Sequence, residues 1–325
     1  MNFLEGFTGK RILVTGGCGY VATSLINLLK HIDCHIIRLD KKGAIFPQFN
    51  AIAQIEDIAC DVRDHTIWEK VLYKTDIVFH FAAQTSIYIA NENPVMDAEI
   101  NISPLLNMLE TCRRKSWRPV VLFSSTVTVV GVPACLPVDE SFVGFPVTTY
   151  DLHKLMAENY LKYYVTQGIV CGVILRLANV YGPGPRSSSS DRGILNLMMR
   201  KALNGETLTI YGKGDYLRDY IYIEDVANAF LLSALKIELI NGQHFVIGTG
   251  KGHTVAEAIN LIADRVALKT GKISRIIHIE PDSPQSPIES RNFVADSRKI
   301  FNTIGWKALC PLVDGIDATI LNLLK

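Results

Sequence analysis

An apolar run, a glycine-rich turn and a helical stretch open the sequence, and this arrangement constrains the fold more than any other feature. Residues 11–16, RILVTG, have the composition of a buried strand, and residues 20–31, YVATSLINLLKH, that of a helix. Between them, VTGGCGYVA places Gly16, Gly19 and Ala22 at a GxxGxxA spacing. Gly16 permits the tight turn, and Gly19 lets the backbone approach a pyrophosphate that the helix N-terminus stabilises. The segment therefore predicts a dinucleotide-binding turn.

Apolar runs and helical stretches continue to alternate beyond this turn. Further strands are expected at 35–40, 76–83, 119–125 and 171–182, and further helices at 66–72, 104–114 and 150–167. Strand and helix alternating in this way indicate βαβ units, because parallel strands need a crossover connection. We therefore predict an α/β fold with a Rossmann-type, doubly wound parallel sheet.

The composition changes after residue 181, where YGPGPRSSSSDRG combines glycine, proline and a run of serines. We expect an NAD-binding Rossmann domain over residues 1–175, to which the chain returns around 215–250. Residues 176–325 are expected to form mainly a smaller α/β domain that binds the substrate. The serines at 187–190 fit a flexible connector and a lid over the substrate equally well, and both interpretations stay open.

An aspartate ends the second predicted strand about 20 residues after the glycine turn, which is the spacing of a ribose-binding carboxylate. That residue, Asp40, favours NAD, because its carboxylate would repel the 2′-phosphate of NADP. Lys41 and Lys42 follow directly and could pair with that phosphate, so the preference rests on Asp40 alone.

Tyr150 and Lys154 stand one turn apart in the predicted helix 150–167. A phenol titrates near pH 10 in water, so it acts as a base near neutral pH only beside a positive charge. The lysine ammonium would supply that charge, and oxidised nicotinamide a second one. The pair follows VVLFSSTVTVVG (120–131), an expected strand end that carries Ser124, Ser125 and Thr126. A hydroxyl there could hold the reacting oxygen of a substrate.

Composition excludes several other classes of protein. The formal net charge of +1 provides no field for nucleic acid or an anionic membrane surface. No apolar run approaches the roughly 20 residues of a membrane span, and the N-terminal segment lacks the features of a signal peptide, so we expect a cytoplasmic protein. The seven cysteines are scattered, which favours buried, reduced thiols over disulfides or a metal site.

At this point the motifs resemble those of the extended short-chain dehydrogenase/reductase family, specifically its nucleotide-sugar epimerases and dehydratases. The resemblance covers nearly the whole chain. It is carried by TGGCGYVA (15–22), CDVRD (60–64), HFAAQTS (80–86), INISPLLNMLE (100–110), SSTVTVVG (124–131), YDLHK (150–154), LRLANVYGPG (175–184), RDYIYIEDVANA (218–229) and ESRNFVADSRKIFNTIGW (289–306). Ala22 replaces the last glycine of the first motif, Ser103 and Pro104 replace Gly-Thr, and Val130 replaces a tyrosine.

The resemblance implies a role for each matched position. Thr126, Tyr150 and Lys154 would be catalytic. The NAD-binding residues would be Gly16, Gly19, Tyr20, Val21, Asp40, Asp61, Val62, Phe81, Ala82, Ala83, Asn101, Ser124, Tyr150, Lys154 and Tyr181. The nucleotide-sugar ligands would be Gln84, Ser86, Thr126, Asn179, Arg218 and Arg291. Asp219 and Glu289 are alternative partners for the two arginines, and His80 and His153 are expected to be structural.

The expected reaction follows from a pair of acidic residues that the chain lacks. The 4,6-dehydratases of this family carry an Asp-Glu pair after the catalytic threonine, whereas this chain has Val127 and Thr128. A valine cannot transfer a proton, so we predict an NAD-dependent 4-epimerase acting on a nucleotide sugar, with a UDP-sugar as the default. A 4-keto-sugar reductase or a dehydrogenase is the alternative, and a dehydratase or a non-catalytic nucleotide sensor ranks below. Helices 94–114 and 150–167 could pair into a homodimer.

Overall fold

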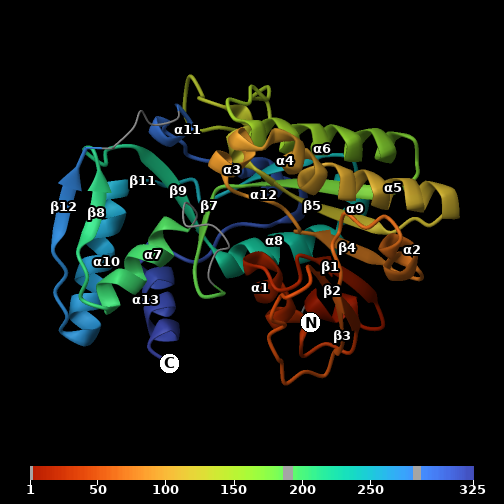
Figure 1. Cartoon of the computed structure of the whole chain (residues 1–325), viewed down its shortest axis with the longest axis horizontal. Coiled ribbons are helices and arrows are strands. Elements are labelled where there is room, and N and C mark those ends of the chain that lie inside the picture. Colours follow the sequence, from red (N-terminus) through yellow and green to blue (C-terminus); the bar gives the residue numbers. More distant parts are fainter. Residues whose placement is uncertain (1–2, 186–192, 281–286) are drawn as a thin grey trace.

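The computed structural model describes residues 3–185, 193–280 and 287–325; the serine run 187–190 lies outside the described residues. A seven-stranded sheet in the order β10-β6-β5-β4-β1-β2-β3 forms its centre (Figure 1). The strands are β1 (Arg11–Thr15), β2 (His35–Asp40), β3 (Gln54–Ala59), β4 (Ile77–His80), β5 (Val120–Thr126), β6 (Cys171–Leu177) and β10 (His244–Ile247). Every pairing between them is parallel. The predicted Rossmann-type sheet is therefore confirmed.

Helices cover both faces of this sheet because its central strands are apolar on both faces. In β1, Ile12 and Val14 belong to a core with α1 (Tyr20–Leu29), α8 (Ile223–Leu235), α9 (Ile237–Ile240) and α12 (Arg298–Ile304). Leu13 points the other way, into a core with α2 (Ile67–Leu72), α5 (Ser103–Lys115) and α6 (Thr149–Thr166). Alternate residues of a strand face opposite sides, so one continuous apolar run fills two cores.

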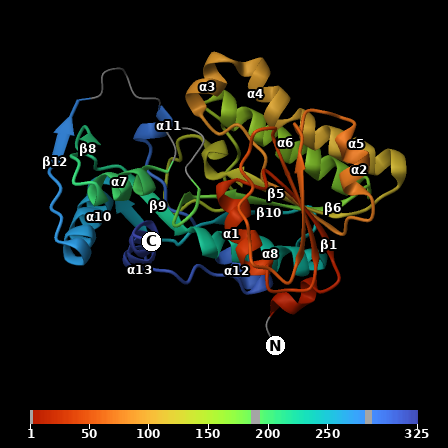
Figure 2. The same cartoon turned by 60° about the horizontal axis from the view of Figure 1, so that its bottom comes forward.

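The remaining elements form a smaller group beside the sheet, at the left in Figure 1 and again in Figure 2. It contains a three-stranded sheet, β11-β9-β7, and a two-stranded sheet, β12-β8. Their bounds are β7 (Asn179–Tyr181), β8 (Leu208–Tyr211), β9 (Leu217–Tyr222), β11 (Gly252–Thr254) and β12 (Ile276–Ile279). The helices α7 (Ile194–Leu203), α10 (Val255–Thr270) and α13 (Leu312–Leu323) pack with these strands around a third core. The chain returns to the large sheet through α8 and β10. The predicted domain boundaries stay a prediction.

The remaining elements are short. They are the 3-10 helices η1 (Phe3–Phe7) and η2 (Val127–Val130) and the helices α3 (Ile87–Glu92), α4 (Pro94–Asn101) and α11 (Pro287–Ser290). Together with α6, helices α3 and α4 lie above the large sheet in Figure 1.

Three element predictions need correction, and the edge strand of the large sheet was missed. The strand expected at 171–182 is two strands, because β6 ends at Leu177 and β7 joins the smaller sheet through β9. The strand expected at 120–131 ends at Thr126, whose hydroxyl accepts a hydrogen bond from the Thr128 amide and starts η2. The helix 94–114 breaks at Ile102 between α4 and α5. The edge strand β3 was not predicted, because QIEDIA is too polar for a buried strand.

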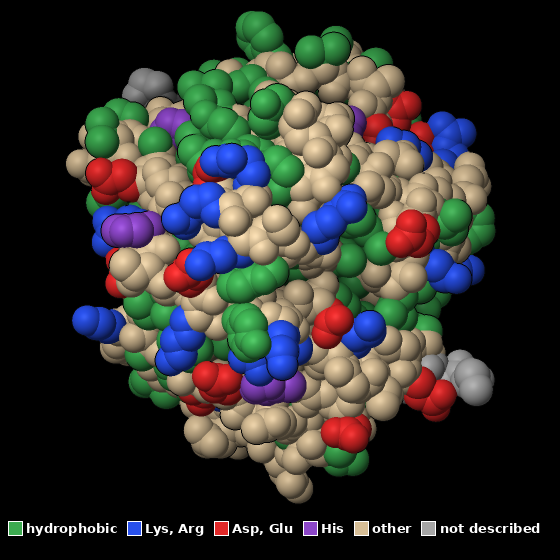
Figure 3. Space-filling view, turned by 90° about the vertical axis from the view of Figure 1, so that its right-hand side faces the viewer, with side chains coloured by type: hydrophobic (Ala, Val, Ile, Leu, Met, Phe, Trp, Pro, Cys, Tyr) green, Lys and Arg blue, Asp and Glu red, His purple; other side chains and the backbone are tan. Residues whose placement is uncertain are grey.

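The cysteines, the helix lengths and the surface charge relate to the classes of protein that the composition argued against. The prediction of buried thiols holds in full only for Cys34 and Cys112. Cys135, in the loop after η2, is exposed, and the other four cysteines are only partly buried. No helix in the described part of the chain is long and apolar enough to cross a membrane. Lys and Arg side chains are interspersed with Asp and Glu on the face shown in Figure 3.

Candidate active site

The glycine turn between β1 and α1 brings two chain segments into close contact. Gly16 has a φ of +64°, and a Cβ atom there would lie 2.9 Å from the Ala82 amide nitrogen. Gly19 caps α1 in an extended conformation, and its amide donates to the Gly16 carbonyl over 2.8 Å. Because Gly19 has no side chain to occupy the first amides of α1, these can bind an anion at the positive end of the helix.

The carboxylate of Asp40 lies at this turn. Its Oδ2 accepts from the Cys18 amide over 2.8 Å, and its Oδ1 accepts from the Lys41 amide over 2.8 Å. Each oxygen keeps a further lone pair for a hydroxyl donor. A glycine turn closed against Ala82, open helix amides and a carboxylate at the end of β2 together fit the pyrophosphate and ribose of NAD.

Asp40→Asn tests this fit. The amide keeps the size of the side chain but loses the charge that strengthens hydrogen bonds from a diol. We expect NAD affinity to fall by about 10- to 100-fold and discrimination against NADP to shrink. Calorimetric titration of cofactor-stripped protein with each dinucleotide measures both. Wild-type protein that binds NADP as tightly as NAD would contradict the role given to Asp40.

The other predicted cofactor residues lie along the same edge of the sheet or just beyond it. The Tyr20 hydroxyl donates to the Gly182 carbonyl over 2.6 Å and accepts from Asn196 of α7. Phe81 packs edge-on against Phe230, and the Ala82 amide donates to the Thr15 hydroxyl. Val21, Ala83 and Ser124 are half-buried, and Val62 is at the border of full burial.

Asp61 and Tyr181 are two further predicted cofactor contacts. Asp61 is paired with Arg63 beside a shallow depression of about 470 Å³ that Glu99 also lines, and this arginine lowers the pKa of the carboxyl group. Tyr181 is 1% exposed, with its hydroxyl toward the Leu312 carbonyl in the core of the smaller group. A nicotinamide contact from this segment would therefore come from its backbone.

Helix α6 carries the candidate catalytic pair. Thr148 caps it by accepting a hydrogen bond from the Asp151 amide. Tyr150 and Lys154 are 6% and 3% exposed, and Tyr150 packs with apolar side chains of α3 and α11. The Lys154 ammonium lies 4.2 Å from the centre of the Phe123 ring of β5. The helix thus holds a phenol and an ammonium inside the protein, at the carboxyl end of β5.

Burial lowers the pKa of Lys154 to about 8, although the negative charges of Glu158 and Asp97 act in the opposite direction. Lys154 in turn adds to the effect of burial on His80, whose pKa falls to about 3. The neutral His80 ring bonds to the Thr15 hydroxyl over 3.0 Å. Near neutral pH, Lys154 is therefore the positive group in this part of the site.

Lys154→Met should make the protein more stable. The pKa of Lys154 in the folded protein lies below its ordinary value of 10.5, so the unfolded chain binds more protons. The free energy of unfolding of the wild type therefore rises between about pH 8 and pH 10.5. Below about pH 8 Lys154 is charged in the folded and in the unfolded protein, so the full cost of burying its charge lowers the stability. We expect Lys154→Met to raise the free energy of unfolding by about 1–3 kcal/mol at pH 7 and to remove the rise. Urea unfolding across this pH range measures both effects; a destabilised variant would contradict them.

A hydrogen-bonded chain joins the end of β5 to α6. The Thr126 hydroxyl lies 2.8 Å from the Thr128 hydroxyl, which donates to the buried Asp151 carboxylate. Because Thr128 gives its one proton to Asp151, Thr126 must donate to Thr128. Thr126 also accepts from the Thr128 amide, which leaves it one lone pair for a substrate hydroxyl.

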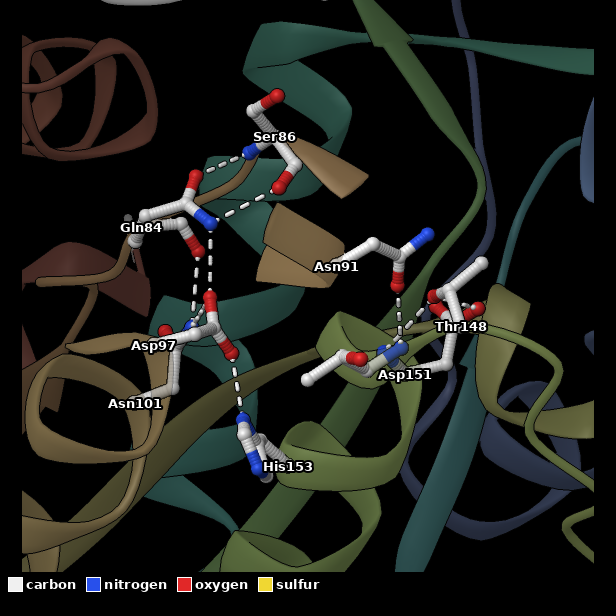
Figure 4. Close-up of polar contacts among 9 residues, drawn as sticks. Gln84, Ser86, Asn91, Asp97, Asn101, Thr148, Asp151 and His153 are labelled. Carbon is white, nitrogen blue, oxygen red and sulfur yellow. Dashed lines mark hydrogen bonds and ion pairs between the residues drawn. The ribbon is translucent and has the colours of Figure 1, made fainter. Parts of the chain in front are cut away.

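The loop after β4 is fastened to α4 and α6 by a second network (Figure 4). The Gln84 amide donates to Asp97 over 2.7 Å and to the Ser86 carbonyl over 2.8 Å. Asn101 donates to Asp97 over 2.9 Å, and His153 bonds to it over 2.6 Å. Ser86 is buried and caps α3 through the Ile89 amide. The predicted sugar contacts of Gln84 and Ser86 therefore concern groups that already have protein partners.

The predicted diphosphate ligands lie on the side of the smaller group. Asn179 begins β7, two residues beyond Leu177, the partner of Thr126 in the sheet, and pairs with Tyr220 of β9. Arg218 donates to the carbonyl groups of Glu289 and Arg291, so the two arginines are neighbours. Asp219 instead accepts from the backbone amides of Thr249, Gly250 and Ala295.

Three buried acids that support α6 were not among the predicted site residues. Asp97, Asp151 and Glu158 are each 0% exposed. Glu158 binds Arg176 and Ser125, while Asp151 binds two threonines. Their presence in an amphipathic pattern indicated solvated helix positions, and only their partners on distant segments distinguish them. The described residues contain no group of three or more His, Cys, Asp or Glu side chains suited to a metal ion.

Comparisons with known proteins agree with the motifs. The model of the NAD dependent epimerase/dehydratase family matches residues 12–248. A putative UDP-glucose 4-epimerase of Methanocaldococcus jannaschii is 32% identical over 316 residues, which is 95% of this chain and 97% of the relative. UDP-glucuronic acid decarboxylase 1 of Danio rerio is 29% identical over 98% of this chain and 74% of its own.

A solved structure extends the agreement to three dimensions. UDP-glucose 4-epimerase of Thermotoga maritima, crystallised with UDP-glucose, superimposes with a TM-score of 0.86 at 28% identity and covers 97% of this chain and 98% of its own. The resemblance that the motifs predicted is confirmed. This chain belongs to the NAD dependent epimerase/dehydratase family, within the extended short-chain dehydrogenases/reductases.

Proposed function

We propose that the protein is a nucleotide-sugar 4-epimerase that acts on a UDP-sugar through a transient 4-keto intermediate. The observation that carries the proposal is the buried pair of Tyr150 and Lys154 at the carboxyl end of β5. A phenol beside an ammonium in a site closed to water is suited to remove the proton of a sugar hydroxyl. NAD, when bound at the glycine turn, supplies the acceptor for the C4 hydride and its later donor.

Residues of the protein bind the sugar nucleotide and transfer the proton. Thr126 would accept a hydrogen bond through its last lone pair from a sugar hydroxyl other than the reacting one, because the single proton of the C4 hydroxyl goes to Tyr150. Tyr150 takes that proton as a phenolate, which the positive charge of Lys154 stabilises. Arg218 and Arg291 would bind the diphosphate, because guanidinium groups match phosphate oxygens. Arg218 would then exchange backbone carbonyl partners for phosphate.

Three neighbouring reactions remain as alternatives. A 4-keto-sugar reductase or a dehydrogenase would need the same Tyr150, Lys154 and Thr126. A 4,6-dehydratase needs an acid and a base after Thr126, where Val127 is 2% exposed and the Thr128 hydroxyl is already held by Asp151. Epimerisation requires no proton-transfer group beyond these three, so the residues support it better than they support dehydration.

A panel of nucleotide sugars, supplied without added cofactor, tests the proposal. Mass spectrometry and NMR would detect a product of unchanged mass with inverted C4. A product lighter by water would instead identify a dehydratase, and one lighter by carbon dioxide a decarboxylase. Turnover only with reduced cofactor and a 4-keto sugar would replace the epimerase by a reductase.

The kcat of the enzyme should decline above about pH 8. There the Lys154 ammonium loses its proton, because burial sets its pKa to about 8, and the Tyr150 phenolate loses its positive neighbour. Measuring kcat between about pH 6 and 10 gives this decline, the alkaline limb of the pH profile. Lys154→Arg, which stays charged throughout, should lack it. A wild-type profile that stays flat to pH 10 would contradict the role of Lys154.

We also propose a homodimer through α4, α5 and α6. Several apolar side chains of α4 and α6 are exposed, among them Val95 at 72%, Leu152 at 45% and Met156 at 39%. A second copy would cover them by helix packing. Light scattering of the purified protein and of Val95→Glu tests it; a monomeric wild type would refute it.

A further inference from the structure

Asp97 of α4 is a buried carboxylate for which the family motifs assign no role. It is 0% exposed, and Gln84, Asn101 and His153 converge on it (Figure 4). Its Oδ1 accepts from the Gln84 and Asn101 amides over 2.7 and 2.9 Å. Its Oδ2 lies 2.6 Å from Nδ1 of His153. All of these groups are donors to the carboxylate.

These partners come from three different segments. Gln84 belongs to the loop after β4 that also carries Ala82, which contacts the glycine turn. Asn101 ends α4, and His153 lies on α6 directly before Lys154. Asp97 therefore joins the loop that lines the cofactor site to the helix that carries Tyr150 and Lys154. A shift of either segment would break a hydrogen bond to a buried charge, which is costly.

Two carboxylates, Glu158 and Asp97, act on the charge of Lys154, and Glu158 has the larger effect. Glu158 also binds the buried Arg176 through bonds of 2.8 and 3.0 Å, so that guanidinium offsets part of its charge. The Gln84 and Asn101 amides that bind Asp97 are uncharged and do not offset its charge. The other titratable groups around Lys154, His80 on β4 and His153 and Tyr150 on α6, carry no negative charge in their neutral forms.

We propose that Asp97 is a positioning residue of the active site, which locks the cofactor-lining loop to α6 and adds negative charge that favours the ammonium form of Lys154. The inference deepens the proposed function, since it assigns a support to the Tyr150–Lys154 pair. It concerns the state of Lys154 and not the identity of the sugar. Its first test therefore needs no substrate.

A double-mutant cycle in the unfolding equilibrium of cofactor-stripped protein measures the coupling. Asp97→Asn keeps the size of the side chain and the Oδ1 acceptor but removes the charge, and Lys154→Met removes the ammonium. We expect the two substitutions to be non-additive by about tenfold or more in the unfolding equilibrium constant, because each removes one of two opposite charges that interact inside the protein. Additive effects would overturn the proposal. Asp97→Ser replaces Asp97→Asn in the cycle if the latter does not fold.

His153→Asn is the matched control. It retains an N–H donor for Asp97 and leaves the carboxylate charge in place, so its cycle with Lys154→Met should be additive within about twofold. Coupling of His153 to Lys154 as strong as that of Asp97 would indicate general packing and would overturn the assignment to the Asp97 charge.

The alkaline limb of kcat provides a second readout. Asp97→Asn should move it to lower pH by about one unit, whereas Asp97→Glu, which keeps the charge, should leave it in place. A merely structural role would lower kcat without moving the limb and would overturn the proposal. If Asp97 and Lys154 are coupled in the mutant cycle but the protein turns over no nucleotide sugar, the proposed epimerase activity is refuted and the role of Asp97 is supported. If their effects are additive in a protein that is an active epimerase, the role of Asp97 is refuted and the epimerase activity stands.

Discussion

Tyr150→Phe is expected to lower kcat by about 10²- to 10⁴-fold, the usual contribution of a positioned acid–base group. Phenylalanine keeps the ring that is 94% buried in the wild type but has no oxygen to take the proton. The substrate KM should change little, because arginine contacts to the diphosphate are untouched. Steady-state kinetics on the nucleotide sugar that the wild type accepts measures both constants.

Tyr163→Phe is the control for this substitution. Tyr163 lies on the same helix but is 58% exposed, so loss of its hydroxyl should leave kcat within about twofold. Activity of Tyr150→Phe equal to that of the control would remove Tyr150 from the mechanism. It would also reopen a non-catalytic role in nucleotide sensing.

Glu158→Gln should cause the largest loss of stability among single changes in α6. Glu158 is 0% exposed and binds Arg176, itself 3% exposed, through bonds of 2.8 and 3.0 Å. The neutral amide leaves the arginine charge buried without compensation. We expect the free energy of unfolding to fall by about 3–5 kcal/mol. Urea unfolding followed by circular dichroism measures it.

Lys162→Gln removes the other positive partner of Glu158 and serves as the control. That ion pair is 3.8 Å long, and the lysine side chain is 29% exposed, so water screens it. Its loss should cost less than about 1 kcal/mol. Equal losses for the two variants would mean that the buried pair with Arg176 has no special weight in the stability of α6.

Much of the fold could be predicted because its determinants are local. Continuous apolar runs such as RILVT and VVLFSS indicate strands buried on both faces, and GxxGxxA requires a turn that only glycine can adopt at Gly16. The edge strand β3 escaped prediction because its outer surface faces water and its sequence is mixed. The break between β6 and β7 depends on pairing with β9, about 40 residues further along the chain, which no local pattern encodes.

The candidate site divides in the same way. Tyr150, Lys154 and Asp40 follow from spacing and position, because their neighbours in sequence set their surroundings. The buried acids could not be predicted, since an aspartate in a helix is normally solvated. Asp97 differs only because residues 84 and 153 meet it in space. Likewise, the direction of the Thr126 hydroxyl depends on Asp151, which reaches it through Thr128.

A deuterium label at C4 of a UDP-sugar, followed through one equilibration with the purified protein and no added cofactor, reports whether the hydride leaves C4 and returns. We expect C4-inverted product that keeps its deuterium, because the hydride returns from a cofactor that stays bound. Inversion with loss of the label, or recovery of the sugar with unchanged C4 configuration, would contradict it.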